Sequence, residues 1–310
     1  MITGMTLHTH HQNRRKQKKK QLFGGKVREA VPAYIHADGK SVEHALELVQ
    51  QRLEDGWKNV RIQVNGYGGQ NPSMGRLKNT LPGVYYDPKY YMKETIETFR
   101  KARERFGDEV GLCHDVHERL TPSDAMIFAK EMEEFKLLFL EDLLPPEQVK
   151  WFEQVRAHTV IPLAIGELFN NPNEWESIVM KRQIDYLRLH FSQVGGITPI
   201  KKAVALCEVC GVRTAWHGPG DVSPIAHAAG AHVSIAALNL GIQEWSCSIK
   251  ENTYEVFPGM PVVKNGFIYL NDKPGLGIDI DEQKAAMYPC KDVPQKWTIA
   301  RLSDGTPVKP

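Results

Sequence analysis

The sequence lacks any apolar run that approaches the roughly 18 residues needed to cross a lipid bilayer. Its N-terminus also lacks the apolar core of a secretory signal peptide. Cysteine is scarce, and the five cysteines are odd in number and unevenly spaced along the chain. This cysteine usage favours a reduced, cytoplasmic setting. We therefore expect a cytoplasmic protein that has no membrane partner.

A strong net charge is also missing, because 39 Lys and Arg residues oppose 37 Asp and Glu residues and leave a formal charge of +2. That balance gives no indication of a nucleic-acid partner. Six of the basic residues lie between His8 and Lys20, and the rest of the chain is mildly acidic. Residues 1–21 show no hydrophobic periodicity, and we expect them to form a disordered basic leader. Such a run could contact RNA or act as an address signal, but a solvated extension is the favoured interpretation.

What the chain does have is three apolar runs that end in Asp115, Glu141 and Glu167, and each carboxylate comes 26 positions after the one before it. Short apolar runs predict buried strands, and the amphipathic segments between them predict helices. Strands and helices that alternate at constant spacing are typical of a parallel sheet with helical crossovers. The sequence therefore predicts an α/β fold.

The same pattern extends over most of the chain and predicts eight strands and seven helices. The expected strands are 30–36, 59–64, 110–115, 137–141, 161–167, 185–190, 212–217 and 241–245. The expected helices are 42–54, 92–105, 121–135, 148–158, 173–180, 198–210 and 223–239. We expect residues 22–254 to form a (β/α) barrel. The Pro- and Gly-rich segment 255–310 is expected to pack on one side of it.

In such a barrel the side chains that do chemistry lie at the carboxyl ends of the strands. Three carboxylates that converge there without interleaved bases require a cation to neutralise them. Ligands that are all oxygen favour a hard ion, most simply Mg²⁺. Polar residues at the later strand ends continue the series, and they are Arg188, His190, His217 and Glu244.

Carboxylates on Mg²⁺ with histidines on neighbouring strands suit the abstraction of a proton next to a substrate carboxylate. A base of near-neutral pKa removes the proton, and an acid on the other face can help a hydroxyl group to depart. Histidine meets that demand. The candidates are His217 and His117, which strand alternation predicts to lie on the same face as Asp115.

Five short segments together resemble the enolase superfamily, in particular its mannonate dehydratase branch. This branch includes starvation-sensing proteins and D-galactonate dehydratase family members. The segments are Cys113–His117, Phe139–Asp142, Ala164–Leu168, Arg188–His190 and Trp216–Asp221. The resemblance covers roughly residues 22 to 290. It implies a TIM-type (β/α)7β barrel and a cytoplasmic sugar acid dehydratase that acts on an aldonate of the D-mannonate or D-gluconate type to give a 2-keto-3-deoxy sugar acid.

The resemblance also implies roles for individual residues. It implies that Mg²⁺ is bound by Asp115, Glu141 and Glu167, and that His117 transfers protons. The residues implied to contact the sugar acid are Glu167, Arg188, His217, Asp221 and Glu244.

Two departures from this family are visible in the sequence. Members carry an N-terminal capping domain, and here Leu22–Gly25 resembles its end, so that we expect the domain to be largely missing. The branch also places an Arg at the end of the second strand and a Tyr further along the following loop. Arg61 fits the Arg, but Ser73 stands at the usual position of the Tyr. Tyr67 is our choice for that role by proximity, over the nearby Tyr85 and Tyr86.

The missing cap leaves a second function open, a barrel that binds an acid sugar or metabolite in a sensing role without efficient turnover. The presence of Arg61 and His117 favours the enzyme, since a binding protein needs no acid/base residues. The sequence does not identify the sugar acid. We also expect a homo-oligomer, because relatives assemble and an uncovered barrel mouth could bind a partner subunit.

Overall fold

The computed structural model describes residues 22–70, 85–220, 222–289 and 301–307. The strands form one ten-stranded sheet in the order β2-β3-β4-β5-β6-β7-β8-β1-β10-β9, and β1 pairs with β2 as well. In this order the eight strands from β1 through β8 form a closed ring of parallel strands. This is the sheet that the sequence predicts. The basic leader 1–21, Ser73 and Asp221 lie outside the described residues.

Residue contacts divide the chain into two compact units. The first unit contains the described residues from His36 to Ala164 and residues 301–307. The second unit contains the described residues up to Ile35 and those from Ile165 to 289. Strands β1 (Val31–Gly39) and β5 (Leu163–Ile165) each contribute residues to both units.

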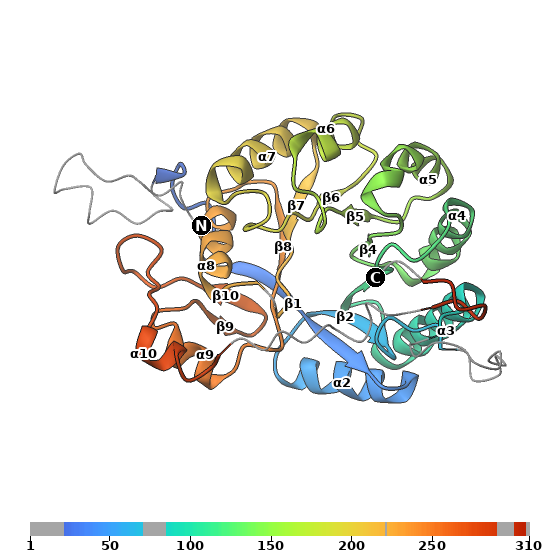
Figure 1. The fold of residues 1–310 in the computed structure, drawn as a ribbon, viewed down its shortest axis with the longest axis horizontal. Helices are drawn as coiled ribbons and strands as arrows, with labels where there is room; N and C mark the ends of the chain where they lie inside the picture. Colours follow the sequence, from blue (N-terminus) through green and yellow to red (C-terminus); the bar gives the residue numbers. More distant parts are fainter. Residues whose placement is uncertain (1–21, 71–84, 221, 290–300, 308–310) are drawn as a thin grey trace. The chain divides into compact units, whose positions relative to one another are not determined.

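In the first unit, three parallel strands alternate with helices along the chain (Figure 1). The strands are β2 (Asn59–Val64), β3 (Gly111–Asp115) and β4 (Leu140–Glu141). The α-helices are α2 (Val42–Glu54), α3 (Pro88–Phe106), α4 (Pro122–Glu131) and α5 (Phe152–His158). Two 3₁₀ segments, η3 (Met132–Phe135) and η4 (Pro146–Trp151), occupy parts of the chain that we predicted as α-helix.

Capping side chains fix where the helices of this unit begin. Ser41 accepts a hydrogen bond from a backbone N–H of the first turn of α2, and Thr121 does the same for α4. The bounds predicted for α2 and β2 are confirmed. The helix predicted to begin at residue 92 begins earlier, because Asp87 caps it and Pro88 occupies its first position.

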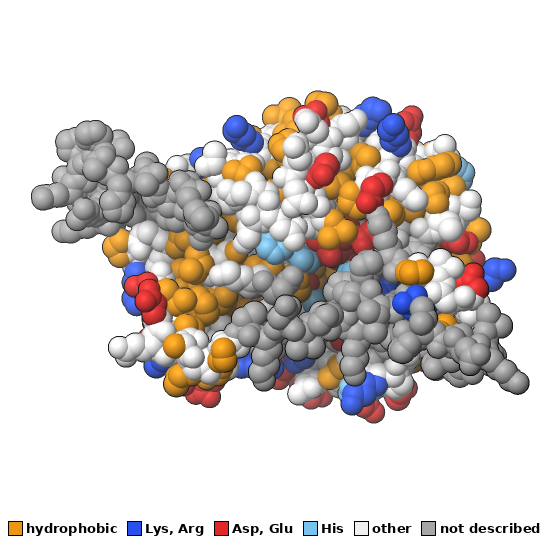
Figure 2. All heavy atoms as spheres, in the orientation of Figure 1, with side chains coloured by type: hydrophobic (Ala, Val, Ile, Leu, Met, Phe, Trp, Pro, Cys, Tyr) orange, Lys and Arg blue, Asp and Glu red, His pale blue; other side chains and the backbone are white. Residues whose placement is uncertain are grey.

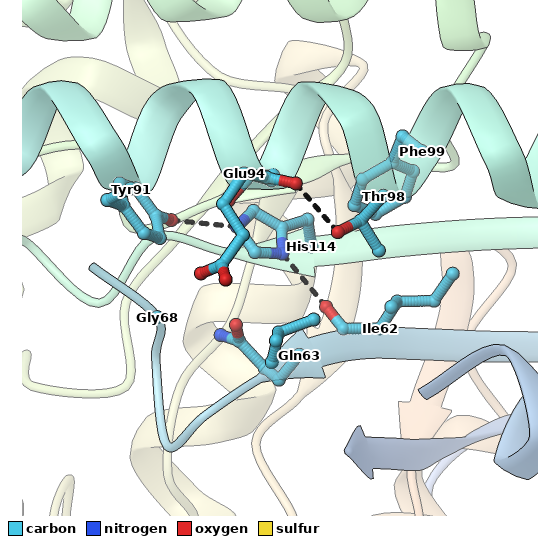
Figure 3. Close-up of a pocket in the computed structure, with 10 residues that line it drawn as sticks. Ile62, Gln63, Gly68, Tyr91, Glu94, Thr98, Phe99 and His114 are labelled. Carbon is cyan, nitrogen blue, oxygen red and sulfur yellow. Dashed lines mark hydrogen bonds between the residues drawn. The ribbon is translucent and has the colours of Figure 1, made fainter. Parts of the chain in front are cut away.

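His114 shows which way the side chains of β3 point. It is 2% exposed, and its Nε2 lies 2.7 Å from the Tyr91 hydroxyl of α3, while its Nδ1 lies 2.9 Å from the Ile62 carbonyl oxygen (Figure 3). Burial lowers the pKa of His114 to about 4, so the ring is neutral. Since successive side chains of a strand alternate, Cys113 and Asp115 point to the opposite face of β3. That face carries the candidate site.

The second unit contains the parallel strands β6 (Tyr186–Leu187), β7 (Arg213–Trp216) and β8 (Leu240–Glu244). Its helices are α6 (Pro172–Met180), α7 (Ile197–Cys210), α8 (Pro224–Ser234), α9 (Glu251–Val256) and α10 (Glu282–Ala285). The helix predicted to reach residue 239 ends at Ser234. The Arg28 side chain donates hydrogen bonds to the carbonyl oxygens of Ser234, Ala237 and Leu238, which takes these groups out of a continuing helix.

The segment after α9 contains a hairpin that the sequence analysis did not predict. Strands β9 (Val262–Lys264) and β10 (Phe267–Tyr269) pair antiparallel, and β10 pairs antiparallel with the start of β1. The two turn residues, Asn265 and Gly266, have φ angles of 51° and 73°. Positive φ at both positions is typical of a two-residue hairpin turn.

Apolar side chains gather on the surface over β9, β10 and α10 (Figure 2). Val262, Tyr269, Met287 and Tyr288 are 57%, 42%, 62% and 53% exposed. The homo-oligomer stays a prediction.

Within the part of the chain that the structure describes, no helix has the length and apolar character to cross a membrane.

Candidate active site

Two of the three predicted metal ligands end neighbouring strands of the first unit. Asp115 is the last residue of β3 and Glu141 is the last residue of β4, and the two residues are paired in register. Paired residues of adjacent strands project from the same face of a sheet. Asp115 is 1% exposed and Glu141 is fully buried. Two neighbouring carboxylates at this depth suit a site that a cation neutralises.

The turn after β3 holds His117 in a backbone conformation that non-glycine residues seldom adopt. His117 and Glu118 have φ angles of 57° and 56°. The backbone N–H of His117 donates to Asp115 Oδ1 at 2.8 Å, and that of Glu118 donates to the Asp142 carbonyl oxygen at 2.7 Å. Residues in this region cost about 1–3 kcal/mol each and cluster at functional sites.

His117 lies beside Asp115 for a different reason from the one that we predicted. We expected strand alternation to place it on the face of Asp115, but β3 ends at Asp115. His117 is positioned instead by its left-handed backbone and by its hydrogen bond to the Asp115 carboxylate. The residue still lies beside the predicted metal ligand, as the sequence analysis required.

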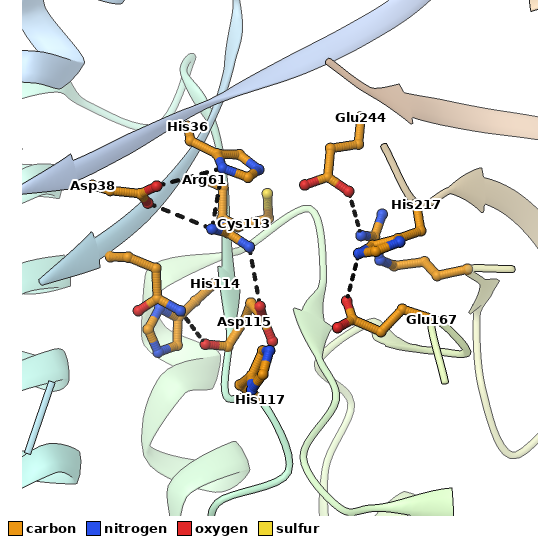
Figure 4. A network of polar contacts seen from close by, with 12 residues as sticks. His36, Asp38, Arg61, Cys113, His114, Asp115, His117, Glu167, His217 and Glu244 are labelled. Atoms are coloured by element: carbon orange, nitrogen blue, oxygen red, sulfur yellow. Dashed lines mark hydrogen bonds and ion pairs between the residues drawn. The ribbon is translucent and has the colours of Figure 1, made fainter. Parts of the chain in front are cut away.

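Arg61 of β2 forms a buried polar network with Asp115 (Figure 4). Its Nη1 donates to Asp115 Oδ2 at 3.0 Å. Its Nη2 lies 3.2 Å from His36 Nδ1 and 3.5 Å from Asp38 Oδ1. Partial burial raises the pKa of Asp38, but the charge of Arg61 and the contact with His36 outweigh it and lower this pKa to about 2. The guanidinium of Arg61 therefore contacts the carboxylates of both Asp115 and Asp38.

Tyr67 lies against His117. The centroids of the two rings are 4.2 Å apart. The guanidinium carbon of Arg61 is 5.9 Å from the Tyr67 ring centroid, and that of Arg119 is 5.1 Å from it. The structure thus brings together Arg61, Tyr67 and His117, the three acid/base candidates of this unit. Their catalytic roles stay predictions.

The other tyrosines that the sequence offered are less suited to proton transfer. Tyr85 is 8% exposed and Tyr86 is 1% exposed. Burial raises the pKa of Tyr86, which keeps its phenol neutral. The Tyr67 ring, by contrast, packs on His117.

In the second unit, Glu167 forms an ion pair with His217. The two side chains approach to 3.2 Å, and both are largely buried (Figure 4). Burial lowers the pKa of His217, but the charge of Glu167 and its hydrogen bond outweigh this effect and raise the pKa above its usual value. The His190 ring lies 5.4 Å from the His217 ring. The ion pair with Glu167 therefore favours the charged form of His217.

Arg188 and Glu244 form a second ion pair in the same unit. Arg188 Nη2 donates to Glu244 Oε2 at 2.8 Å, and neither side chain has more than 1% of its surface exposed. The same carboxylate oxygen accepts a hydrogen bond from the backbone N–H of Gly218 at 2.8 Å. Arg188 also stacks over the Tyr34 ring, with its guanidinium carbon 5.7 Å from the centroid. This network anchors the chain that follows β7.

Three residues of these networks were missed in the sequence analysis. His36 and Asp38 alternate at the end of β1, but the predicted strand stopped at His36, so that Asp38 was not considered. Arg119 follows His117 by two residues, and nothing in its local pattern distinguishes it from a surface arginine. A predicted first strand that extended beyond His36 would have included Asp38.

Comparisons with known proteins decide the family. Residues 44–284 match a family model described as enolase C-terminal domain-like. A D-galactonate dehydratase family member of Enterococcus gallinarum is 63% identical over 290 residues, which cover 94% of this chain and 72% of that protein. The chain belongs to the enolase superfamily. Within it, the chain belongs to the D-galactonate dehydratase family.

Other members of the enolase superfamily agree with this assignment. A D-galactonate dehydratase family member of Salmonella virchow is 42% identical over 306 residues, covering 93% of this chain and 73% of that protein. The crystal structure of an enolase from Pantoea ananatis contains bound D-gluconate and Mg and is 40% identical to this chain. It superposes with a TM-score of 0.90 over 94% of this chain and 74% of that one. The predicted family and the TIM-type barrel fold are both confirmed.

Proposed function

We propose that this enolase-superfamily protein is a Mg²⁺-dependent hydro-lyase that dehydrates a sugar acid. The proposed substrate is an aldonate of the D-mannonate or D-gluconate type, and the product is a 2-keto-3-deoxy sugar acid. The observation that carries this proposal is the pair of buried carboxylates at the ends of β3 and β4 beside the strained turn of His117. The 63% identity to a D-galactonate dehydratase family member supports it.

We assign Mg²⁺ to Asp115, Glu141 and Glu167. All three donors are carboxylate oxygens, which suit a hard cation. They are 1%, 0% and 7% exposed, so that each carboxylate is buried and calls for a neutralising partner. When bound, Mg²⁺ acts as a Lewis acid that stabilises the negative charge of a deprotonated sugar acid.

The proton transfers are assigned to His117, Tyr67 and His217, with Arg61 as the fixed cation beside Tyr67. His117 or Tyr67 removes the proton next to the substrate carboxylate. Either residue is a candidate because the two rings pack against each other and lie at the same place in the site. The raised pKa of His217 favours its charged form, which suits a donor of the proton that the departing hydroxyl needs. Glu167, Arg188, His217, Asp221 and Glu244 are assigned to the sugar acid.

The test is a turnover screen with purified protein, Mg²⁺ and a panel of five- and six-carbon aldonic acids, assayed for 2-keto-3-deoxy product. We expect product from at least one acid, and we expect it to disappear with a chelator and in the variant His117→Asn. No product from any acid, in a protein that still binds Mg²⁺, would support a sensing barrel in place of a dehydratase.

A further inference from the structure

Arg119 is a buried cation that the proposed reaction does not use. It lies between β3 and α4 and is 7% exposed. Its Nε and Nη2 atoms have no hydrogen-bond partner among the described residues. Charged side chains are rarely buried to this extent unless they are paired. The burial of Arg119 therefore requires another source of stabilisation.

Two aromatic rings supply that stabilisation. The guanidinium carbon of Arg119 lies 5.1 Å from the Tyr67 ring centroid and 5.4 Å from the Tyr86 ring centroid. A guanidinium within about 6 Å of a ring face is attracted by the electrons of that ring. The Tyr67 ring in turn packs on His117 at 4.2 Å. Arg119 thus contacts the same Tyr67 ring that packs on His117, its partner in the proposed acid/base pair.

The charges around these rings determine which tyrosine responds to Arg119. Burial raises the pKa of Tyr86 and outweighs the lowering by the charge of Arg119, while Asp124 and Asp87 add to the rise, so that Tyr86 stays neutral. Tyr67 has a second cation nearby, Arg61, at 5.9 Å. The charged or titratable neighbours on the other side are His117 and Glu118, whose Oε2 is 3.8 Å from His117 Nδ1.

We propose that Arg119 is a positioning residue that holds the Tyr67 ring against His117 and stabilises the phenolate form of Tyr67. The proposal rests on the proposed function, in which Tyr67 takes part in proton transfer. A tyrosine acts as a base only when its phenolate is accessible near neutral pH. Two guanidinium groups near one ring, those of Arg61 and Arg119, provide the charge that this requires.

The first experiment measures the ionisation of Tyr67 without substrate. The ultraviolet absorbance of phenolate is titrated against pH in each protein with and without Tyr67→Phe, and the difference isolates Tyr67. Arg119→Met keeps an unbranched side chain between the rings but removes the charge, and Arg119→Lys keeps the charge. We expect the pH midpoint of Tyr67 ionisation to rise by about one unit or more in the Met variant. A smaller rise is expected in the Lys variant.

The matched control is Arg105→Met, because Arg105 also stacks on an aromatic ring, Phe106 at 5.3 Å, but lies at the surface. It should leave the midpoint of Tyr67 unchanged. If Arg119→Met does not fold, Arg119→Gln provides a second neutral variant with the same expected rise. A folded neutral variant with the wild-type midpoint would overturn the proposal.

The second experiment measures turnover with the sugar acid that the screen identifies. We expect Arg119→Met to lower kcat by at least about tenfold, with KM and Mg²⁺ affinity nearly unchanged, and Arg119→Lys to recover part of the loss. Equal losses in the Met and Lys variants would indicate packing alone and would contradict the proposed role. If the wild type converts no acid, the proposed function fails, while the titration of Tyr67 still decides the role of Arg119.

Discussion

Removal of the Arg61 guanidinium is a change whose effect on the free energy of unfolding can be estimated from the structure. Arg61 and Asp115 approach to 3.0 Å, and their side chains are 6% and 1% exposed. The variant Arg61→Met keeps a side chain of similar length but leaves the Asp115 carboxylate without this partner. Breaking a buried ion pair by removing one member costs about 3–5 kcal/mol. We expect the free energy of unfolding to fall by that amount in the absence of metal.

Urea unfolding measures this change, and Arg105→Met serves as its control. Arg105 pairs with Glu43 at 3.3 Å, but the two side chains are 37% and 66% exposed. An exposed pair contributes about 0–1 kcal/mol. If the Arg61 and Arg105 variants lose similar amounts of stability, the reasoning about the buried network is wrong.

Repeating the unfolding with saturating Mg²⁺ extends the test to the metal assignment. A cation bound at Asp115 would take over part of the neutralisation that Arg61 provides. The loss caused by Arg61→Met should therefore be smaller with Mg²⁺ than without it. A loss that does not depend on Mg²⁺ would argue against a metal ion at Asp115.

Two further predictions concern the neighbouring residues. The pKa of Asp38 in the folded protein, about 2, is below its unfolded value of about 3.9, so that its stabilisation is present above pH 4 and lost as the pH falls to about 2. The unfolding free energy of Asp38→Asn should converge with that of the wild type over this window, and a constant difference would refute the linkage. In Gly218→Ala, the added Cβ would lie 2.5 Å from the Glu244 carbonyl oxygen and 2.8 Å from His227 Cε1. We expect a loss of about 1–3 kcal/mol in urea unfolding, and no loss would mean that the chain after β7 can move.

The order of strands and helices could be predicted from the sequence because each is marked by local signals. Helix α2 begins after a capping serine, Ser41, and β2 is a continuous run whose bounds were predicted correctly. The hairpin of β9 and β10 was missed, although its Asn265-Gly266 turn is a strong local signal. Its flanking strands are only three residues each, too short for a hydrophobic period to stand out.

The candidate site was predictable where its residues end strands and less so where they lie in turns. Asp115 and Glu141 end β3 and β4, so their pairing follows from the periodicity of the sheet. His117 was selected by an alternation that does not extend beyond β3. The stack of Arg119 on Tyr67 depends on the positive φ angle of 76° at Tyr67, which no periodicity predicts.

The most direct measurement on this account is a calorimetric titration of Mg²⁺ into the wild type and into Glu141→Gln. Glutamine keeps the size of the side chain and removes its charge. We predict that the wild type binds Mg²⁺ and that Glu141→Gln abolishes detectable binding, because a buried carboxylate ligand is lost at the end of β4. Unchanged affinity in a folded Glu141→Gln variant would contradict the assignment of the metal and the reaction that depends on it.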